Sequence, residues 1–283
     1  MKINSPLWLL RAVLLAHLMS LATSASGAIA AGGLAIIGYD DEEDSFTVVA
    51  LDAIAAGEEV YFTNNGWNNA LGQFNGAAPD QGAGNESLIK LTVTDTIAKG
   101  SVFSSSANGS GWTWTTSGLI PGQDEGGFGE FSSLALDYES DQIYIFQASG
   151  SNPLVNPDHF VYALLFGSVD YPTFADSEDS LTGAVPPGLS EGLFTAFAQT
   201  DFGMHGDADG LHSAWGINLN DSTISALQQN GAHREGWLEA FADSSNWTQG
   251  QPVVASLHVM PEPSRALLLG LGVGGLLLRR RRN

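Results

Sequence analysis

The stretch LAIIGYDDEEDSFTVVAL, residues 34–51, decides the fold class. Two short runs of apolar and β-branched residues, 34–39 and 45–51, flank five consecutive acidic residues. Runs of this length that stop at a polar turn are typical of strands, whereas helices need longer periodic segments. We therefore expect the folded part of the chain to open with two strands joined by an acidic turn.

The same alternation of short apolar runs and turns continues along the chain. A turn at residues 55–58 precedes a third predicted strand at 59–63, which the Asn- and Gly-rich segment 64–69 ends. Further strands are predicted at 87–92, 101–103, 112–115, 142–147, 160–166 and 253–257, and short helices at 222–229 and 234–242. In the second helix Trp237, Leu238 and Phe241 share one face. The pattern predicts an all-β fold, a β-sandwich with one or two short C-terminal helices.

Composition excludes several classes of protein. The 283 residues include 31 Asp and Glu but only 10 Lys and Arg, and the formal net charge is −21. A nucleic-acid binder needs clustered positive charge, so nucleic acid is excluded as a partner. The absence of Cys excludes disulfides, thiolate metal sites and Cys nucleophiles. The low charged fraction of 14% and the 34 Gly are typical of a β-rich protein outside the cytoplasm.

The N-terminal region has the order of a secretory signal peptide. Lys2 and Arg11 are followed by an apolar run at 12–19 and then by small residues that end in Ala28-Ile29-Ala30. The apolar run is too short to cross a bilayer core of ~30 Å, which disfavours a membrane anchor. We expect a signal peptide over residues 1–30, with Ala28 and Ala30 at the cleavage site and the secretion machinery as a partner.

The C-terminal region combines three features in a fixed order. Pro261-Glu262-Pro263 precedes a run of thirteen uncharged residues at 266–278, and Arg279, Arg280, Arg281 and Arg282 follow. A helix of that length spans only ~20 Å, but arginine side chains can extend to the inner headgroups and fix this end in the cytoplasm. The pattern predicts a short transmembrane helix.

This tail closely resembles the PEP-CTERM sorting signal of exopolysaccharide-producing Gram-negative bacteria. The resemblance covers residues 261–283 and implies that Pro261, Glu262 and Pro263 are recognised by an exosortase, a membrane-embedded peptidase that cuts near the motif. It also implies an inner-membrane intermediate and a final place on the outer surface or in the extracellular matrix. A plain single-pass C-terminal anchor is the alternative.

The part between the ends, residues 31–258, resembles a domain of secreted bacterial surface proteins. The resemblance rests on the strands within 36–67, on 141–147, on the segment 185–189 and on the short helix followed by Asn246-Trp247-Thr248. It implies a β-sandwich loosely like the lamin-tail or immunoglobulin-like fold, and it implies no catalytic residues.

Motifs for chemistry are few. The chain has no G-x-S-x-G, H-E-x-x-H or phosphate-binding loop, so we expect no enzyme. A hydrolase of glycans or esters stays open, because glycosidase carboxylates have no fixed spacing. Asp207 and Asp209 before Gly210 resemble part of a Ca²⁺ loop, and His212 could join them at a metal site. The alternative is a solvated Asp-Gly turn.

Four tryptophans raise the question of a carbohydrate platform. Trp112 and Trp114 are two apart on a predicted strand, so their rings share one sheet face. Trp67 and Trp247 belong to the same candidate set, and burial in the core is the competing explanation for all four.

Together these observations predict an exported, non-enzymatic surface or matrix protein with a structural or adhesive role and exopolysaccharide as a candidate partner. A hydrolase and a Ca²⁺-dependent binding module are the alternatives. Residues 31–260 contain 3 basic and 30 acidic residues, a net charge of −27. Such a body repels acidic polysaccharides unless divalent cations bridge the two.

Overall fold

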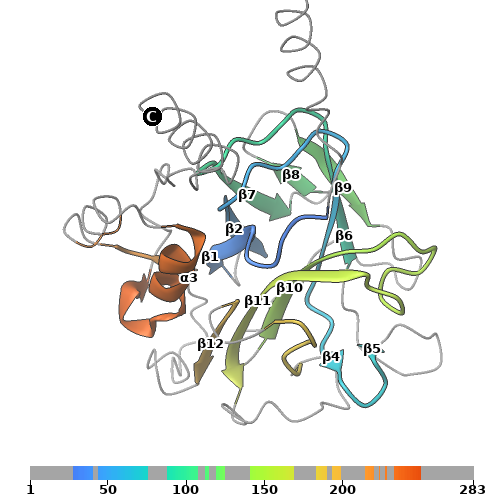
Figure 1. Ribbon diagram of the computed structural model, residues 1–283. Helices are drawn as coiled ribbons and strands as arrows, with labels where there is room; N and C mark the ends of the chain where they lie inside the picture. Colours follow the sequence, from blue (N-terminus) through green and yellow to red (C-terminus); the bar gives the residue numbers. More distant parts are fainter. Residues whose placement is uncertain are drawn as a thin grey trace, which may run out of the picture.

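The structure is a computed structural model, and it describes residues 28–40, 44–75, 88–107, 112–114, 119–124, 141–168, 183–189, 193–198, 214–219, 223, 227 and 233–249 (Figure 1). Strands dominate these ranges, which confirms an all-β protein. Within them, no helix combines the length and the apolar character that crossing a membrane would require.

Twelve of the strands form two six-stranded sheets. The first sheet has the order β14 (Trp247–Gln249), β13 (Ala214–Ile217), β1 (Leu34–Asp40), β2 (Ser45–Ala50), β7 (Val102–Ala107) and β8 (Trp112–Trp114). The second has the order β12 (Phe194–Ala198), β11 (His159–Ser168), β10 (Asp141–Gln147), β3 (Glu59–Thr63), β6 (Leu88–Val93) and β9 (Leu119–Asp124). Strands β11 and β12 pair in parallel, and the other pairs in these sheets are antiparallel.

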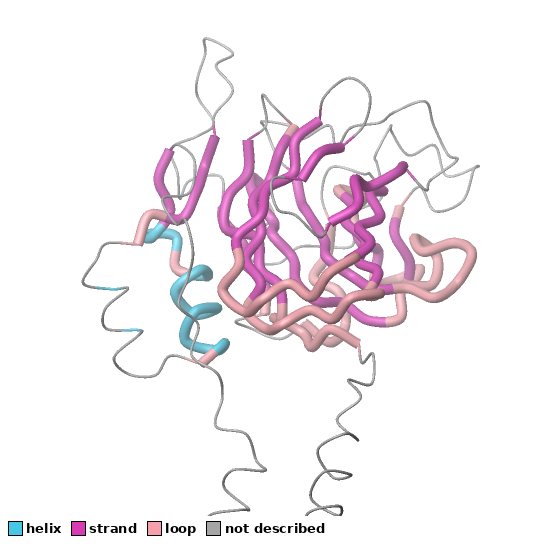
Figure 2. Tube along the Cα trace, turned by 90° about the horizontal axis from the view of Figure 1, so that it is seen from above, coloured by secondary structure: helices cyan, strands magenta, loops and turns pink. Residues whose placement is uncertain are grey.

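The remaining elements lie outside the two sheets. Strands β4 (Trp67–Asn68) and β5 (Gln73–Phe74) form a separate hairpin. The helix α3 (Arg234–Ala242) is followed by the 3₁₀ turn η1 (Ser244–Asn246). Figure 2 shows α3 at one side of the body of strands.

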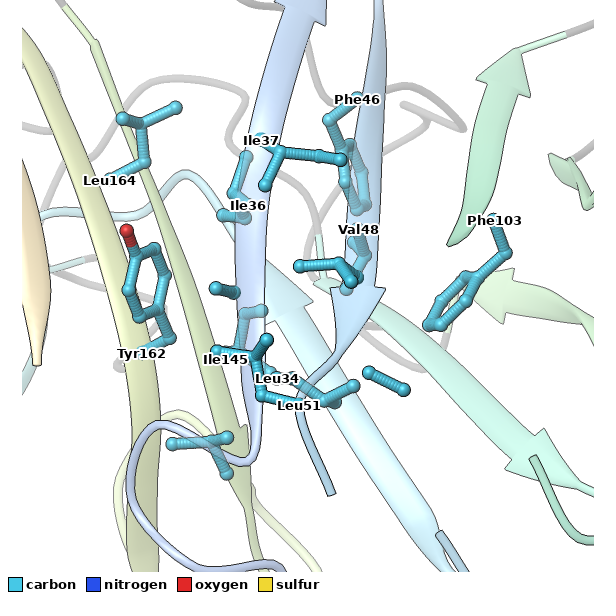
Figure 3. Packing of buried hydrophobic residues seen from close by; sticks show 14 of the residues in the cluster. Leu34, Ile36, Ile37, Phe46, Val48, Leu51, Phe103, Ile145, Tyr162 and Leu164 are labelled. Atoms are coloured by element: carbon cyan, nitrogen blue, oxygen red, sulfur yellow. The ribbon is translucent and has the colours of Figure 1, made fainter. Parts of the chain in front are cut away.

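One hydrophobic core is shared by both sheets. Buried side chains from β1, β2 and β7 belong to the same cluster as those from β3, β6, β10 and β11. The rings of Phe46 on β2 and Phe62 on β3 lie 5.1 Å apart and join the two sheets directly. In Figure 3, Ile36 lies on the side of β1 that faces Tyr162 and Leu164 of β11. The apolar strand residues therefore hold the two sheets together.

Strand β1 is buried along almost its whole length because both of its faces are covered. Its pairing with β2 shifts between Ile36 and Gly38, so Ile37 is an extra residue that interrupts the alternation of faces. Trp237, Leu238 and Phe241 of helix α3 are buried in the same core as the side chains of β1. Continuous burial explains why residues 34–39 are apolar without alternation.

Most of the predicted elements are confirmed. The strands expected at 34–39, 45–51 and 59–63 are β1, β2 and β3, and those at 87–92, 142–147 and 160–166 correspond to β6, β10 and β11. The helix expected at 234–242 is α3, with the expected buried face. Residues 223 and 227 of the other predicted helix are helical. The predicted strand at 253–257 lies outside the described residues.

Some strands were missed, for physical reasons. Residues 64–69 were expected to end a strand without forming another, yet Trp67 and Asn68 pair with Phe74 and Gln73 in a hairpin. Strand β9 contains Pro121, which argues against a strand in the middle of a sheet, but β9 is an edge strand and its pairing with β6 shifts at this point. Strands β13 and β14, of four and three residues, are too short for a sequence pattern to reveal, and the five-residue β12 was not predicted either.

Candidate functional site

A pocket of about 520 Å³ opens beside the β4–β5 hairpin, which Figure 1 shows at the lower right of the molecule. Its walls come from three segments: the hairpin, the connection between β10 and β11 with the start of β11, and residues 187–188. The lining residues are Trp67, Gly72, Val155, Asn156, Pro157, Asp158, His159, Phe160, Pro187 and Gly188. Small-molecule sites commonly have volumes of ~300–1,000 Å³, so the pocket could hold a ligand the size of a sugar.

Trp67 anchors the wall of the pocket. The indole is 3% exposed and packs edge-on against the rings of Phe74 and Phe160, at centroid distances of 5.3 and 4.9 Å. Its Nε1 donates to Asn69 Oδ1 at 2.8 Å, and its backbone carbonyl accepts from the N–H of Ala184 at 2.9 Å. The ring is therefore fixed in a second cluster of buried residues and forms a wall, not an open stacking surface.

The hairpin that carries Trp67 is held by Asn68 and by the β10–β11 connection. Asn68 Oδ1 accepts from the N–H of Leu71 at 3.0 Å, and the N–H of Gly72 donates to the Asn68 carbonyl at 2.8 Å. Gly72 has φ +66°, a conformation that favours glycine. The N–H of Phe74 donates to the Leu154 carbonyl at 3.0 Å and joins the hairpin to the connection. Two walls of the pocket are thus linked by backbone hydrogen bonds.

The polar groups of the pocket come from the β10–β11 connection and from the first residue of β11. Asn156 and Asp158 are exposed, and the N–H of Asp158 donates to the Gln147 carbonyl at 2.9 Å, which fixes the end of this connection. His159 is half-buried, and its Nε2 is shielded from solvent with no hydrogen-bond partner among the described residues. An amide, a carboxylate and an imidazole beside Trp and Pro are suited to a ligand with several hydroxyl groups.

Tyr144 forms hydrogen bonds with Trp67, a wall residue of the pocket, and with Ala184. Its hydroxyl donates to the Ala184 carbonyl at 3.0 Å and lies 3.5 Å from the N–H of Trp67. Burial raises the pKa of Tyr144, the hydrogen bond with Trp67 lowers it by a smaller amount, and the charge of Asp141 raises it further. Tyr144 therefore stays neutral, and its hydroxyl holds the backbone of Ala184 and Trp67 in place.

The predicted metal and sorting residues lie outside the described residues. This holds for Asp207, Asp209 and His212, for the sorting motif 261–263 and for the arginines 279–282. Of the cleavage-site residues, Ala28 and Ala30 are described and both are exposed. Within the described ranges, no three His, Asp or Glu side chains gather as a metal site would require.

The tryptophan set divides into two pairs. Trp67 and Trp247 are 3% and 4% exposed, so the core explanation is correct for both and neither can stack on a polysaccharide. Trp112 and Trp114 lie on β8, as expected, at the edge of the first sheet. Two residues apart on a strand, they occupy positions on the same face of the sheet.

The polar pocket residues were missed by the sequence analysis. The signal available was the connection itself: residues 148–158 contain two Pro and two Asn between two predicted strands, and a hairpin connection is usually 2–5 residues long. Long connections are common places for binding residues.

Comparison with protein-family models, with curated proteins and with solved structures finds no match.

Proposed function

We propose that this chain is an exported, exosortase-processed protein of the bacterial cell surface or extracellular matrix, with a structural or adhesive role and no enzymatic one. The observation that carries the proposal is the tail, in which Pro261-Glu262-Pro263, an apolar run and four arginines follow one another at 261–282. The signal-type N-terminal region supports it, because exosortase substrates must first be exported. The two sheets with a shared core support a sandwich of the lamin-tail or immunoglobulin-like kind.

The adhesive part of the proposal rests on the pocket beside Trp67. Its lining offers hydrogen-bonding groups and apolar rings, a combination that sugars require. The net charge of −27 over residues 31–260 disfavours an acidic polymer. We therefore expect a neutral or amino-sugar polysaccharide to bind, and edge strand β8 with Trp112 and Trp114 is a second candidate contact.

The sorting proposal is tested by removing residues 261–283 and fractionating the producing cells. The unchanged protein should reach the surface or matrix fraction, and the truncated protein should be lost from it. A subtler variant, Glu262→Ala, removes the one charge between the two prolines and should trap the protein in the membrane fraction. If both variants reach the surface fraction as the unchanged protein does, the tail is not a sorting signal.

The binding proposal is tested with a pocket variant and a charge-matched control. Asp158→Asn removes one exposed carboxylate from the pocket, and Glu239→Gln removes one from α3, which Figure 1 shows at the left of the molecule. Asn still accepts a hydrogen bond but without the charge, a difference of about 1–1.5 kcal/mol, so Asp158→Asn should weaken binding to the producer's polysaccharide roughly 5- to 10-fold. Equal binding by both variants would exclude the pocket.

A Ca²⁺-dependent binding module is a second candidate function, favoured by the Asp207-Ala208-Asp209-Gly210 pattern and by the acidic composition. A ligand present at 100 times its dissociation constant stabilises the folded state by ~2.7 kcal/mol. Millimolar Ca²⁺ should then raise the Tm more than Mg²⁺ at the same ionic strength, and Asp209→Asn should remove the difference. Equal melting curves in the two ions would count against this function.

A further inference from the structure

The segment before β1 is part of the fold. The side chain of Ile29 is 7% exposed and belongs to the core shared by the two sheets, whereas its neighbours Ala28 and Ala30 are exposed. The backbone N–H of Ile29 donates to Gln147 Oε1 at 2.7 Å. Gln147 Nε2 in turn donates to Glu58 Oε2 at 3.0 Å, so this contact joins the segment to β10 and to the residue that precedes β3.

The residues that follow Ile29 are fixed as well. The N–H of Gly33 donates to the Ala30 carbonyl at 2.7 Å, and the N–H of Gly32 donates to the Val161 carbonyl on β11 at 2.6 Å. A Cβ added at Gly33 would lie 3.0 Å from Ile29 Cγ2 and 2.9 Å from the Ala30 oxygen. A side chain at position 33 would therefore crowd Ile29, and glycine at this position leaves room for the Ile29 side chain.

From this packing, and on the basis of the proposed export, we infer that the signal peptide is cut on the N-terminal side of Ile29, so that Ile29 is the first residue of the mature protein. A cut after Ala30 would remove an apolar side chain from the core and a donor from Gln147. Ser26 and Ala28 place small residues three and one positions before the inferred cut, as signal peptidase requires.

The cut also preserves the contact that the structure shows. Hydrolysis adds water across the Ala28–Ile29 peptide bond, and the products are a carboxylate on Ala28 and an α-amino group on Ile29. This amino group still carries N–H donors for Gln147 Oε1. Its positive charge would lie on the side of the fold that carries Glu58, in a body with a large excess of acidic residues.

The direct test is N-terminal sequencing of the protein recovered from the surface fraction. A first residue of Ile29 supports the inference, whereas an earlier first residue overturns the cut after Ala28. A first residue of Ala30 or Ala31 overturns the inference while leaving the export proposal intact. An uncleaved protein that stays in the cytoplasm contradicts the export proposal itself.

A second test uses two variants of the full chain, Ile29→Ala and Ala30→Ser, each exported, purified and melted. If Ile29 is retained, Ile29→Ala should lower the Tm by roughly 5–10 °C, whereas Ala30→Ser, at an exposed position, should not change it. If Ile29 is removed with the signal peptide, the exported Ile29→Ala protein has the unchanged mass and the unchanged Tm, and the inference fails.

Discussion

Gly183 packs so closely against Tyr144 and Trp67 that no side chain fits there. A Cβ at this position would lie 2.0 Å from the Tyr144 hydroxyl and 2.8 Å from the Trp67 backbone nitrogen. Both neighbours are buried, so neither can move away cheaply. We expect Gly183→Ala to lower the free energy of unfolding by about 1–3 kcal/mol, measured by urea denaturation.

The control for this prediction is the double variant. Tyr144→Phe removes the hydroxyl that a Cβ at residue 183 would meet, and by itself it should cost ~1–3 kcal/mol because the Ala184 carbonyl loses its hydrogen bond. In Gly183→Ala/Tyr144→Phe the worst overlap is absent, so the combined loss should be smaller than the sum of the two. Additive losses would show that the overlap with Tyr144 is unimportant.

Two buried tyrosines make stability depend on alkaline pH. Burial raises the pKa of Tyr144 and of Tyr162, and the hydrogen bond between Tyr162 and Thr195 only partly offsets the effect for Tyr162. Because the folded-state pKa lies above the unfolded value of ~10, this stability is complete below pH ~10 and is lost as the pH rises beyond it. Tyrosinate absorbance should show that these two groups ionise together with unfolding, and ionisation of all tyrosines before any change in circular dichroism would contradict this.

At the scale of elements, α3 depends on tertiary packing more than on its own sequence. It has nine residues, its N-cap His233 makes no side-chain capping hydrogen bond, and its first residue Arg234 forms an ion pair of 2.6 Å with Asp52. Helices this short are marginal in water by themselves. The buried residues Trp237, Leu238 and Phe241 therefore supply most of its stability.

The expected result for α3 is a large difference between its two faces. Trp237→Ala removes a fully buried ring from the core and should cost ~3–5 kcal/mol of unfolding free energy. Glu239→Ala, at an exposed position of the same helix, should change it by less than ~0.5 kcal/mol. Equal effects in denaturant titrations would mean that α3 does not stabilise the core in the way the structure shows.

At the scale of the whole molecule, charge repulsion opposes folding. The body carries 30 acidic and 3 basic residues between positions 31 and 260. Salt reduces the Debye length from about 30 Å at 0.01 M to about 8 Å at 0.15 M and weakens repulsion between exposed charges. The Tm of the purified protein should therefore rise with NaCl over this range. A Tm that falls or stays constant would show that favourable ion pairs, such as Lys90–Glu59 at 2.8 Å, outweigh the repulsion.

The sequence by itself determined the class of fold and most of the strands. Residues 34–63 show why: short apolar runs, an acidic turn and Gly57, which has φ +90°, are local features that only strands and tight turns satisfy. The amphipathic face of α3 is equally local. The proposed export and sorting signals are also read from linear sequence, because signals of this kind are recognised in extended or membrane-inserted segments.

Only the tertiary structure decided which strands are neighbours and which residues meet. Edge strands such as β9 and the β4–β5 hairpin carry weak patterns, since their pairing depends on partners far away in the chain. Trp67, Asp158 and Gly188 line one pocket although they are far apart in the sequence, and no sequence spacing predicts that they lie together. The burial of Ile29 could not be predicted from the sequence either, because Ile29 is a single apolar residue among alanines and glycines. It is part of the core only because the segment 29–32 is hydrogen-bonded to Gln147 of β10 and Val161 of β11.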